Sequence, residues 1–257
     1  MTKSVELRFY GDLRDFLCYE RTTGMVRRSF DVAGSVKDMI EACGVPHTEV
    51  AMILADGCTV GFGYRVRDGD RIAVYPPFRN LAIEPERLVS RQPLPEPRFV
   101  LDGHLGKLAR YLRLLGFDAV CSAEWTDPEL VELSTGQDRV LLTRDVGLLM
   151  HGVLTRGYYV RATDPRVQVV EVADRFDLGR RVDAFTRCLI CNGVLVVVAR
   201  EEVADRLLPR TRELHDDFQE CPDCGRIYWQ GSHHAQLQVI VDEVTGKSTQ
   251  ATGDGGP

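Results

Sequence analysis

The sequence lacks long apolar runs. No stretch of its 257 residues approaches the roughly 18–20 apolar residues of a membrane helix, and MTKSVELRFY at its start has no signal-peptide apolar segment. We therefore expect a soluble globular protein of the cytoplasm with no membrane partner. An excess of positive charge is also missing, because the formal net charge is −6. This balance argues against a generally basic nucleic-acid-binding protein but leaves room for a local basic patch.

The chain has room for more than one core, since domains commonly contain roughly 100–150 residues. Residues 83–97 are rich in proline, which indicates a linker. Before it, residues 1–82 contain strand-like patterns in VELRFYG, TGMVRRSFDV, VAMILADG and YRVRDGDRIAVYPP, and a helix in SVKDMIEACG with a capping box from Ser35 to Asp38. This order predicts an α+β domain, a β-grasp, that resembles ubiquitin-like sulfur carriers. Those carriers act through a terminal Gly-Gly, but the corresponding place here reads YPPFRN, so we expect a structural role or a protein partner instead.

After the linker the pattern changes. Between residues 98 and 181, the short apolar strands RFVLD, FDAVCS, RVLLTRD and YYVRATD alternate with helical segments. Strict alternation of strands and helices predicts an α/β domain with a parallel sheet. Residues 182–235 contain two cysteine pairs among short strands, and residues 236–257 are expected to be a disordered tail.

Acidic residues follow the strands of the predicted parallel sheet. Asp102 follows the first strand, Asp145 the third and Asp164 the fourth, while Asp127 and Glu129 lie between the second strand and its helix. Ligands bind beyond the carboxyl ends of parallel strands, and clustered carboxylates suit Mg²⁺ or Mn²⁺. The alternative is that these acids cap helices, with Asp127-Pro128 and Asp164-Pro165 each read as an N-cap followed by proline. A cap can also be a ligand, so the two interpretations do not exclude each other.

Basic side chains recur on the helix after Asp102. Lys107, Arg110 and Arg113 are spaced i, i+3, i+6, which predicts a ridge beside the acidic site. Such a ridge would contact a phosphate backbone, with Lys107 next to the scissile phosphate, and Arg144 is a further candidate. The alternative is an ordinary solvated helix face.

The cysteine pairs Cys188-x-x-Cys191 and Cys221-x-x-Cys224 supply four soft ligands, which is typical of a structural tetrahedral Zn²⁺ site in a zinc ribbon. In the cytoplasm, disulfides are the less favoured alternative. Next to the second pair, Arg226, Tyr228, Trp229 and His233 form an aromatic and basic set. They would contact unpaired bases and phosphates, or the two aromatic side chains would pack the ribbon's own core.

Taken together, LDGHLGKLARYLRLLGFD, TDPEL, VLLTRD, ATDP, FTRCLICNGVL and CPDCGRIYWQGSHH resemble the Mut-seven C-terminal RNase family over about residues 98–235. The resemblance implies a PIN-like, metal-dependent nuclease with an appended zinc ribbon. By position, Asp102 and Asp145 match the core metal-binding acids, Asp127 or Glu129 the second acid, and Asp164 the last one.

These observations predict a ribonuclease that hydrolyses RNA phosphodiester bonds with Mg²⁺ or Mn²⁺, assisted by a zinc ribbon, on tRNA or single-stranded RNA. A non-catalytic adaptor, associated with RNA or the ribosome, is the alternative. In it the ribbon binds and the acids only cap helices. A sulfur carrier fused to another module is a third hypothesis, which the missing Gly-Gly disfavours.

Overall fold

The computed structural model describes residues 2–18, 21–78, 83–90, 94–231 and 234–246. The chain divides into two compact units. The first comprises Met1–Glu96 with Trp125–Tyr159, and the second comprises Pro97–Glu124 with Val160–Pro257. The segment predicted as one nuclease domain therefore contributes to both units. Over the described ranges, no helix is long and apolar enough to cross a membrane.

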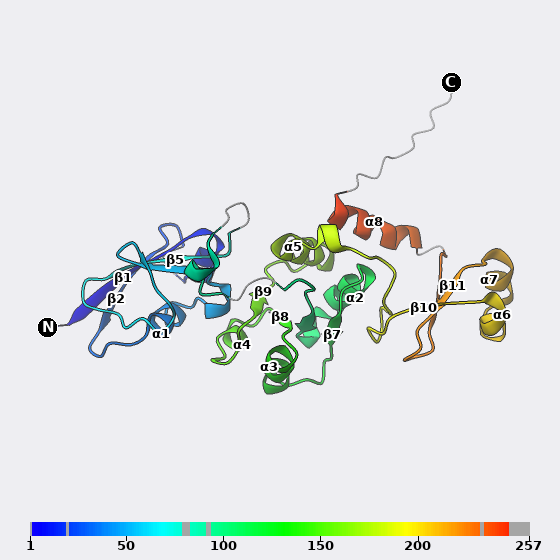
Figure 1. Cartoon of the computed structure of the whole chain (residues 1–257), viewed down its shortest axis with the longest axis horizontal. Coiled ribbons are helices and arrows are strands. Elements are labelled where there is room, and N and C mark those ends of the chain that lie inside the picture. The colour runs from blue at the N-terminus through cyan, green and yellow to red at the C-terminus, as the bar shows by residue number, and fades with distance from the viewer. Residues whose placement is uncertain (1, 19–20, 79–82, 91–93, 232–233, 247–257) are drawn as a thin grey trace, which may run out of the picture. The chain divides into compact units, whose positions relative to one another are not determined.

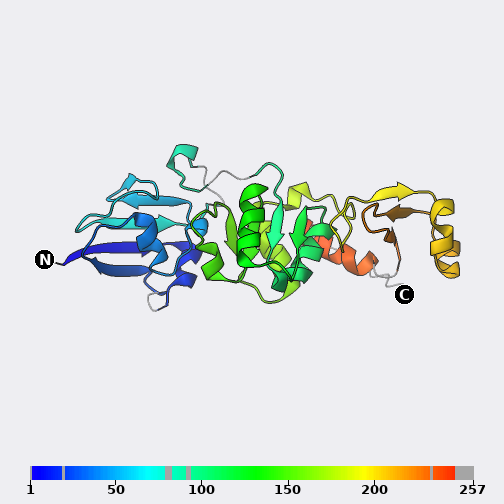
Figure 2. The ribbon, with the colours of Figure 1, turned by 90° about the horizontal axis from the view of Figure 1, so that it is seen from below.

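The N-terminal part of the first unit is a five-stranded sheet, which confirms the predicted β-grasp (Figure 1). Its strands are β1 (Lys3–Phe9), β2 (Met25–Phe30), β3 (Met52–Ala55), β4 (Cys58–Thr59) and β5 (Arg71–Tyr75), in the order β2-β1-β5-β3-β4. β1 and β5 run parallel, and the other neighbours are antiparallel. Helix α1 (Val36–Glu41) crosses one face of the strands (Figure 2). Among the residues of this domain that the structure describes, three short 3₁₀ helices complete it, η1 (Gly11–Phe16), η2 (His47–Glu49) and η3 (Pro85–Arg87).

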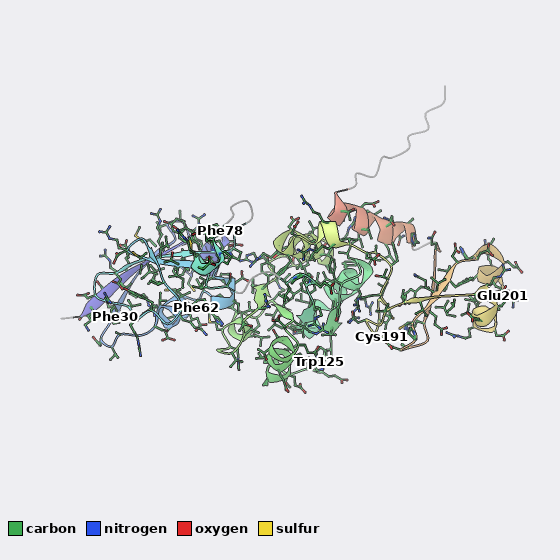
Figure 3. The ribbon with its side chains drawn as sticks, in the orientation of Figure 1. Phe30, Phe62, Phe78, Trp125, Cys191 and Glu201 are labelled. Atoms are coloured by element: carbon green, nitrogen blue, oxygen red, sulfur yellow. The ribbon has the colours of Figure 1, made fainter. Side chains whose placement is uncertain are left out.

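The sequence pattern explains these elements. Alternate residues of β1 (Val5, Leu7 and Phe9) are buried, as the period of two requires. The capping box of α1 forms as predicted, since Asp38 N–H donates to Ser35 Oγ at 3.2 Å and Ser35 N–H donates to Asp38 Oδ2 at 3.1 Å. Phe62 packs against the resulting core (Figure 3).

The first part of the predicted linker belongs to this domain. η3 lies within it, and Val89 packs against the domain core and donates its N–H to Ala51 O at 2.8 Å. The connection between the sheets is therefore shorter than its proline content predicts.

The rest of the first unit contains α3 (Asp127–Gly136), β8 (Val140–Thr143), α4 (Val146–Leu149) and β9 (Gly157–Tyr159). β8 and β9 pair in parallel, with Thr143 opposite Tyr159. β8 is buried along its whole length, as expected of a parallel strand covered on both faces.

The second unit contains β6 (Phe99–Leu101), η4 (Gly103–Leu105), α2 (Gly106–Leu114), β7 (Ala119–Cys121), α5 (Pro165–Phe176) and η5 (Gly179–Arg181). β6 and β7 also pair in parallel, with Leu101 opposite Cys121. The strands after the linker thus pair in parallel and alternate with helices, as predicted from the sequence.

The cysteine-containing part of this unit forms a three-stranded antiparallel sheet of β10 (Val196–Val198), β11 (Phe218–Glu220) and β12 (Ile227–Trp229). Between β10 and β11 lie α6 (Arg200–Val203), η6 (Ala204–Arg206) and α7 (Pro209–Leu214).

The prediction of a disordered tail from residue 236 is wrong over its first part. Helix α8 (His234–Thr245) packs against α2 and α5, and it buries Ile240 and Val241. Arg166 also forms an ion pair with Glu243, with Nε and Oε2 3.1 Å apart. Small and polar residues at the end of the chain obscured this apolar stripe in LQVIV. Residues 247–257 lie outside the described ranges.

Candidate active site and zinc centre

Asp102, Asp145 and Asp164 each cap a helix. Asp102 Oδ1 accepts a hydrogen bond from the N–H of His104 at 3.3 Å at the start of η4. Asp145 Oδ1 accepts from the second and third N–H groups after it at 2.7 and 3.3 Å, and Asp164 Oδ1 does so at 2.9 and 3.3 Å. The capping interpretation therefore holds for all three aspartates.

The capping hydrogen bonds of Asp145 and Asp164 use only one of the two oxygens of each carboxylate. In Asp145 and Asp164, both cap bonds end on Oδ1, so Oδ2 stays outside the cap, and both residues are exposed. Carboxylate oxygen is the donor that Mg²⁺ and Mn²⁺ prefer. The chemistry of these donors therefore fits a hard divalent cation.

The prediction that Asp127 caps the helix after the second strand is wrong. Thr126 is the N-cap of α3, Asp127 is its first residue, and Glu129 closes a capping box by accepting from Thr126 N–H at 2.7 Å and Thr126 Oγ1 at 2.8 Å. These two hydrogen bonds lower the pKa of Glu129. Asp127 is exposed and, within the described ranges, makes no such bond. The structure thus gives Glu129 a structural task that Asp127 does not share.

In each unit, one of the predicted metal-binding acids follows the level end of a pair of parallel strands. In the β6–β7 pair, Leu101 lies opposite Cys121, so the two strands end level, and Asp102 follows directly. Gly103 comes next, and a Cβ there would lie 2.7 Å from the Cα of Ala123, too close for any larger residue without movement. In the β8–β9 pair, Thr143 and Tyr159 end level, and Asp145 comes two residues after Thr143.

The predicted basic ridge on α2 is only partly present. Lys107 and Arg110 are exposed, but Arg113 is 6% exposed. Its Nε donates to Ala119 O at 2.7 Å, and its Nη1 donates to Leu189 O at 3.1 Å and Ile190 O at 2.8 Å. The prediction that Arg113 contacts RNA is therefore wrong. An i+6 spacing turns the side chain about 120° around the helix, from the solvent toward the interior.

Arg144, the other basic candidate, lies beside an aromatic ring. Its guanidinium carbon is 5.9 Å from the centre of the Tyr159 ring, within the range of a cation–π contact. Both residues are half-buried.

The four cysteines form a metal-binding group. Their Sγ atoms all lie within 4.8 Å of one another, and no other such His, Cys, Asp or Glu group occurs in the part of the chain that the structure describes. Cys188 Sγ and Cys224 Sγ are 3.6 Å apart, and Cys191 Sγ and Cys221 Sγ are 3.3 Å apart. These separations exceed a disulfide bond and approach the roughly 3.8 Å between sulfurs around tetrahedral zinc, given Zn–S bonds of about 2.3 Å. The site fits a structural zinc ion.

Two similar turns, here called the zinc knuckles, carry these ligands, and Cys191 on the first is labelled in Figure 3. In the first, Cys188 N–H donates to Gly193 O and Asn192 has φ +76°. In the second, Cys221 N–H donates to Arg226 O and Gly225 has φ +71°. Each left-handed residue is of a type that tolerates this conformation. The repeated geometry explains why asparagine and glycine follow the pairs.

The aromatic and basic set near the second knuckle separates into different environments. Tyr228 Oη lies 3.1 Å from Cys188 Sγ and accepts from Leu189 N–H at 3.1 Å, so this ring packs against the zinc centre, and burial raises the pKa of Tyr228. Burial disfavours the charged form of Cys188, but hydrogen bonds from the backbone N–H of Cys191, the hydroxyl of Tyr228 and the backbone N–H of Ile190 outweigh it and lower the pKa of that thiol to about 6. Of the two alternatives predicted for Tyr228, these contacts favour packing within the ribbon's own core over stacking on bases.

Trp229 and Arg226 are exposed, and Trp229 lines a shallow cavity of about 280 Å³ with Leu208 and Thr211. His233 lies outside the described residues.

The sequence did not reveal how the first zinc knuckle attaches to the corner between α2 and β7. Besides the bonds of Arg113, Asn192 donates from Nδ2 to Asp118 Oδ1 at 2.7 Å and accepts from Ala119 N–H at 3.0 Å. Arg187 Nε donates to Gly116 O at 3.0 Å. These partners are more than 70 positions apart, so no local pattern links them.

Two family models that match this chain agree with this architecture. A family model described as "Mut7-C RNAse domain" matches residues 97–241, and one described as "Mut7-C ubiquitin" matches residues 2–82. Two solved structures of small archaeal modifier protein 1 from Haloferax volcanii are also similar. They are 20% and 21% identical, cover 30% and 29% of this chain and 99% and 96% of their own, and have TM-scores of 0.25 and 0.24. A search of curated proteins finds no match.

Proposed function

Because the chain belongs to the Mut7-C RNase domain family, whose model covers more than half of it, we propose that it is a metal-dependent ribonuclease. It hydrolyses phosphodiester bonds in RNA, with tRNA or single-stranded RNA as candidate substrates. Mg²⁺ or Mn²⁺ is held by Asp102, Asp145 and, in preference to Glu129, Asp127. The observation that carries the proposal is that Asp102 and Asp145 lie just beyond the ends of parallel strands, where such sheets bind ligands.

The side chains divide the work. A divalent cation, when bound, would polarise the scissile phosphate and lower the pKa of an attacking water. The exposed Lys107, one turn after the cap of Asp102, would contact phosphate oxygens, and Arg110 would extend that contact along the RNA backbone. Asp164 is a further acid whose Oδ2 stays available. Trp229 and Arg226 of the zinc ribbon would hold unpaired bases and phosphate.

A non-catalytic RNA adaptor remains the alternative, and one observation favours it. Each of Asp102, Asp145 and Asp164 already has a structural task as a cap. If capping is the whole task, the carboxylate charge should be dispensable, because asparagine caps helices about as well as aspartate.

This property of asparagine gives the test. We would compare wild type with Asp102→Asn and Asp145→Asn on labelled tRNA and single-stranded RNA, with Mg²⁺, with Mn²⁺ and without metal. The matched control is Asp174→Asn, an exposed acid on α5. Both site variants should keep their stability within about 1 kcal/mol, because the cap survives. They should lose about a hundredfold or more in cleavage rate, the scale of one lost electrostatic contact to a transition state.

Equal cleavage by wild type and both site variants would refute the role of the acids. An absence of cleavage by wild type under every metal condition, with RNA binding retained, would instead support the adaptor. The control changes the net charge by the same amount as the site variants but replaces none of the proposed metal-binding acids, so it should cleave at the wild-type rate.

A further inference from the structure

The N-terminal β-grasp contacts the strand β9 of its own unit through buried polar side chains. We propose that this domain acts within the chain to position Arg144 for contact with RNA phosphate, and that Glu49 and Tyr159 are the positioning residues. The inference rests on the proposed ribonuclease function, because it concerns the orientation of a side chain next to Asp145.

The contact begins at Glu49, the last residue of η2. Its side chain is almost fully buried, at 1% exposed, and Oε1 accepts a hydrogen bond from the N–H of Tyr159 at 2.6 Å. Burying a carboxylate is costly unless hydrogen bonds compensate it. The hydrogen bond from Tyr159 N–H is one such compensating bond, and it fixes the direction of that backbone N–H.

A second contact holds η2 in place. His47, also buried, has Nε2 2.7 Å from Leu154 O and Nδ1 2.6 Å from Glu41 Oε1. Lys37 Nζ lies 3.4 Å from Gly152 O, so α1 also reaches the loop before β9. The β-grasp therefore contacts this loop through His47 and Lys37 and the end of β9 through Glu49.

The ring of Tyr159 transmits this placement to Arg144. Phe16 meets the ring edge-on, with centroids 5.5 Å apart and an interplanar angle of 72°. The guanidinium of Arg144 lies over the same ring at 5.9 Å. The negative face of an aromatic ring attracts a cation, so the orientation of Tyr159 biases where Arg144 points.

The backbone supplies a parallel connection. Tyr159 lies opposite Thr143 in the β8–β9 pair, and Asp145 N–H donates to Thr143 Oγ1 at 3.0 Å. Glu49 thus holds the end of β9, which is paired with the end of β8 from which Arg144 and Asp145 emerge. A basic side chain that must meet a phosphate gains from such support, since little is then left to order when RNA binds.

The experiment uses the full chain and two measurements. Binding of a single-stranded RNA without added metal reports on Arg144, and amide hydrogen exchange reports on Tyr159. Glu49→Ala removes the acceptor, whereas Glu49→Gln keeps an Oε1 acceptor without the charge. Tyr159→Leu removes the ring but keeps the backbone N–H, and it serves if Glu49→Ala does not fold. Arg144→Gln removes the cation, and Glu86→Ala, exposed on η3, is the matched control.

We expect Arg144→Gln to weaken RNA binding about tenfold, the value of one charge-assisted contact. Glu49→Ala and Tyr159→Leu should each cause part of that loss, and neither should weaken binding further when combined with Arg144→Gln. Glu49→Ala should also speed exchange at the Tyr159 amide, and Glu49→Gln should restore both properties. Glu86→Ala should match wild type.

If the losses of RNA affinity in Glu49→Ala and Tyr159→Leu add fully to the loss in Arg144→Gln, the proposal is overturned. An unchanged rate of hydrogen exchange at the Tyr159 amide in Glu49→Ala would overturn it too. If wild type binds RNA but never cleaves it, the proposed ribonuclease fails while these binding and exchange results still decide the role of Glu49.

Discussion

Replacing Arg113 with leucine should detach the first zinc knuckle from the corner between α2 and β7. Arg113 is 6% exposed, and its guanidinium donates three hydrogen bonds to carbonyl groups, one on β7 and two between Cys188 and Cys191. Each carbonyl left without a donor in a buried place costs about 1–3 kcal/mol, and the leucine regains part of this through apolar burial. We therefore expect a net loss of about 3–5 kcal/mol.

Urea unfolding followed by tryptophan fluorescence would measure this loss, and the rate at which a chelator removes zinc would locate it. Arg113→Leu should lower the unfolding midpoint and release zinc faster. Arg110→Leu, on the exposed side of the same helix, is the control and should change stability by less than about 0.5 kcal/mol. A change in Arg113→Leu no larger than that of the control would refute the reasoning.

Two further outcomes follow from the caps and the metal site. Because the folded-state pKa of Glu129 is lowered, its stabilising effect is present above the unfolded value and is lost as pH falls through the folded pKa. An NMR titration should therefore give Glu129 a midpoint below 4.5, and Thr126→Val should raise it. Metal analysis of reduced protein should find a single zinc ion per chain. The substitution Cys191→Ser should weaken or abolish zinc binding. Protein that is zinc-free as purified would contradict the ribbon assignment.

The sequence predicted the features that depend on neighbours along the chain. Period-two burial in β1, the capping box from Ser35 to Asp38 and the C-x-x-C spacing all act over a few residues, and the structure contains each of them. The same holds for the positions of Asp102 and Asp145, one and two residues after the ends of apolar strands.

Features that depend on distant partners were missed. Arg113 looked like a surface residue because its carbonyl partners lie 76 and 77 positions away. Glu49 gave no signal either, since it meets Tyr159 across 110 positions. Thr126 was overlooked as the cap of α3 because Asp127-Pro128 offered a plausible cap one residue later. For α3 the capping rule holds, but Thr126 fills the cap in place of Asp127. For Arg113 a tertiary contact overrides the expected exposure of a charged side chain.

The cover over β9 has a consequence for anyone who would cut this chain into parts. β9 is the last strand of its sheet, with β8 on one side and the polar groups of η2 next to its end. A fragment starting at Pro97 would keep the whole matched RNase segment but lose that cover. Bare edge strands readily pair with other chains, so such a fragment should tend to aggregate. The segment that matches the RNase family should therefore be produced with the first 96 residues of the chain attached.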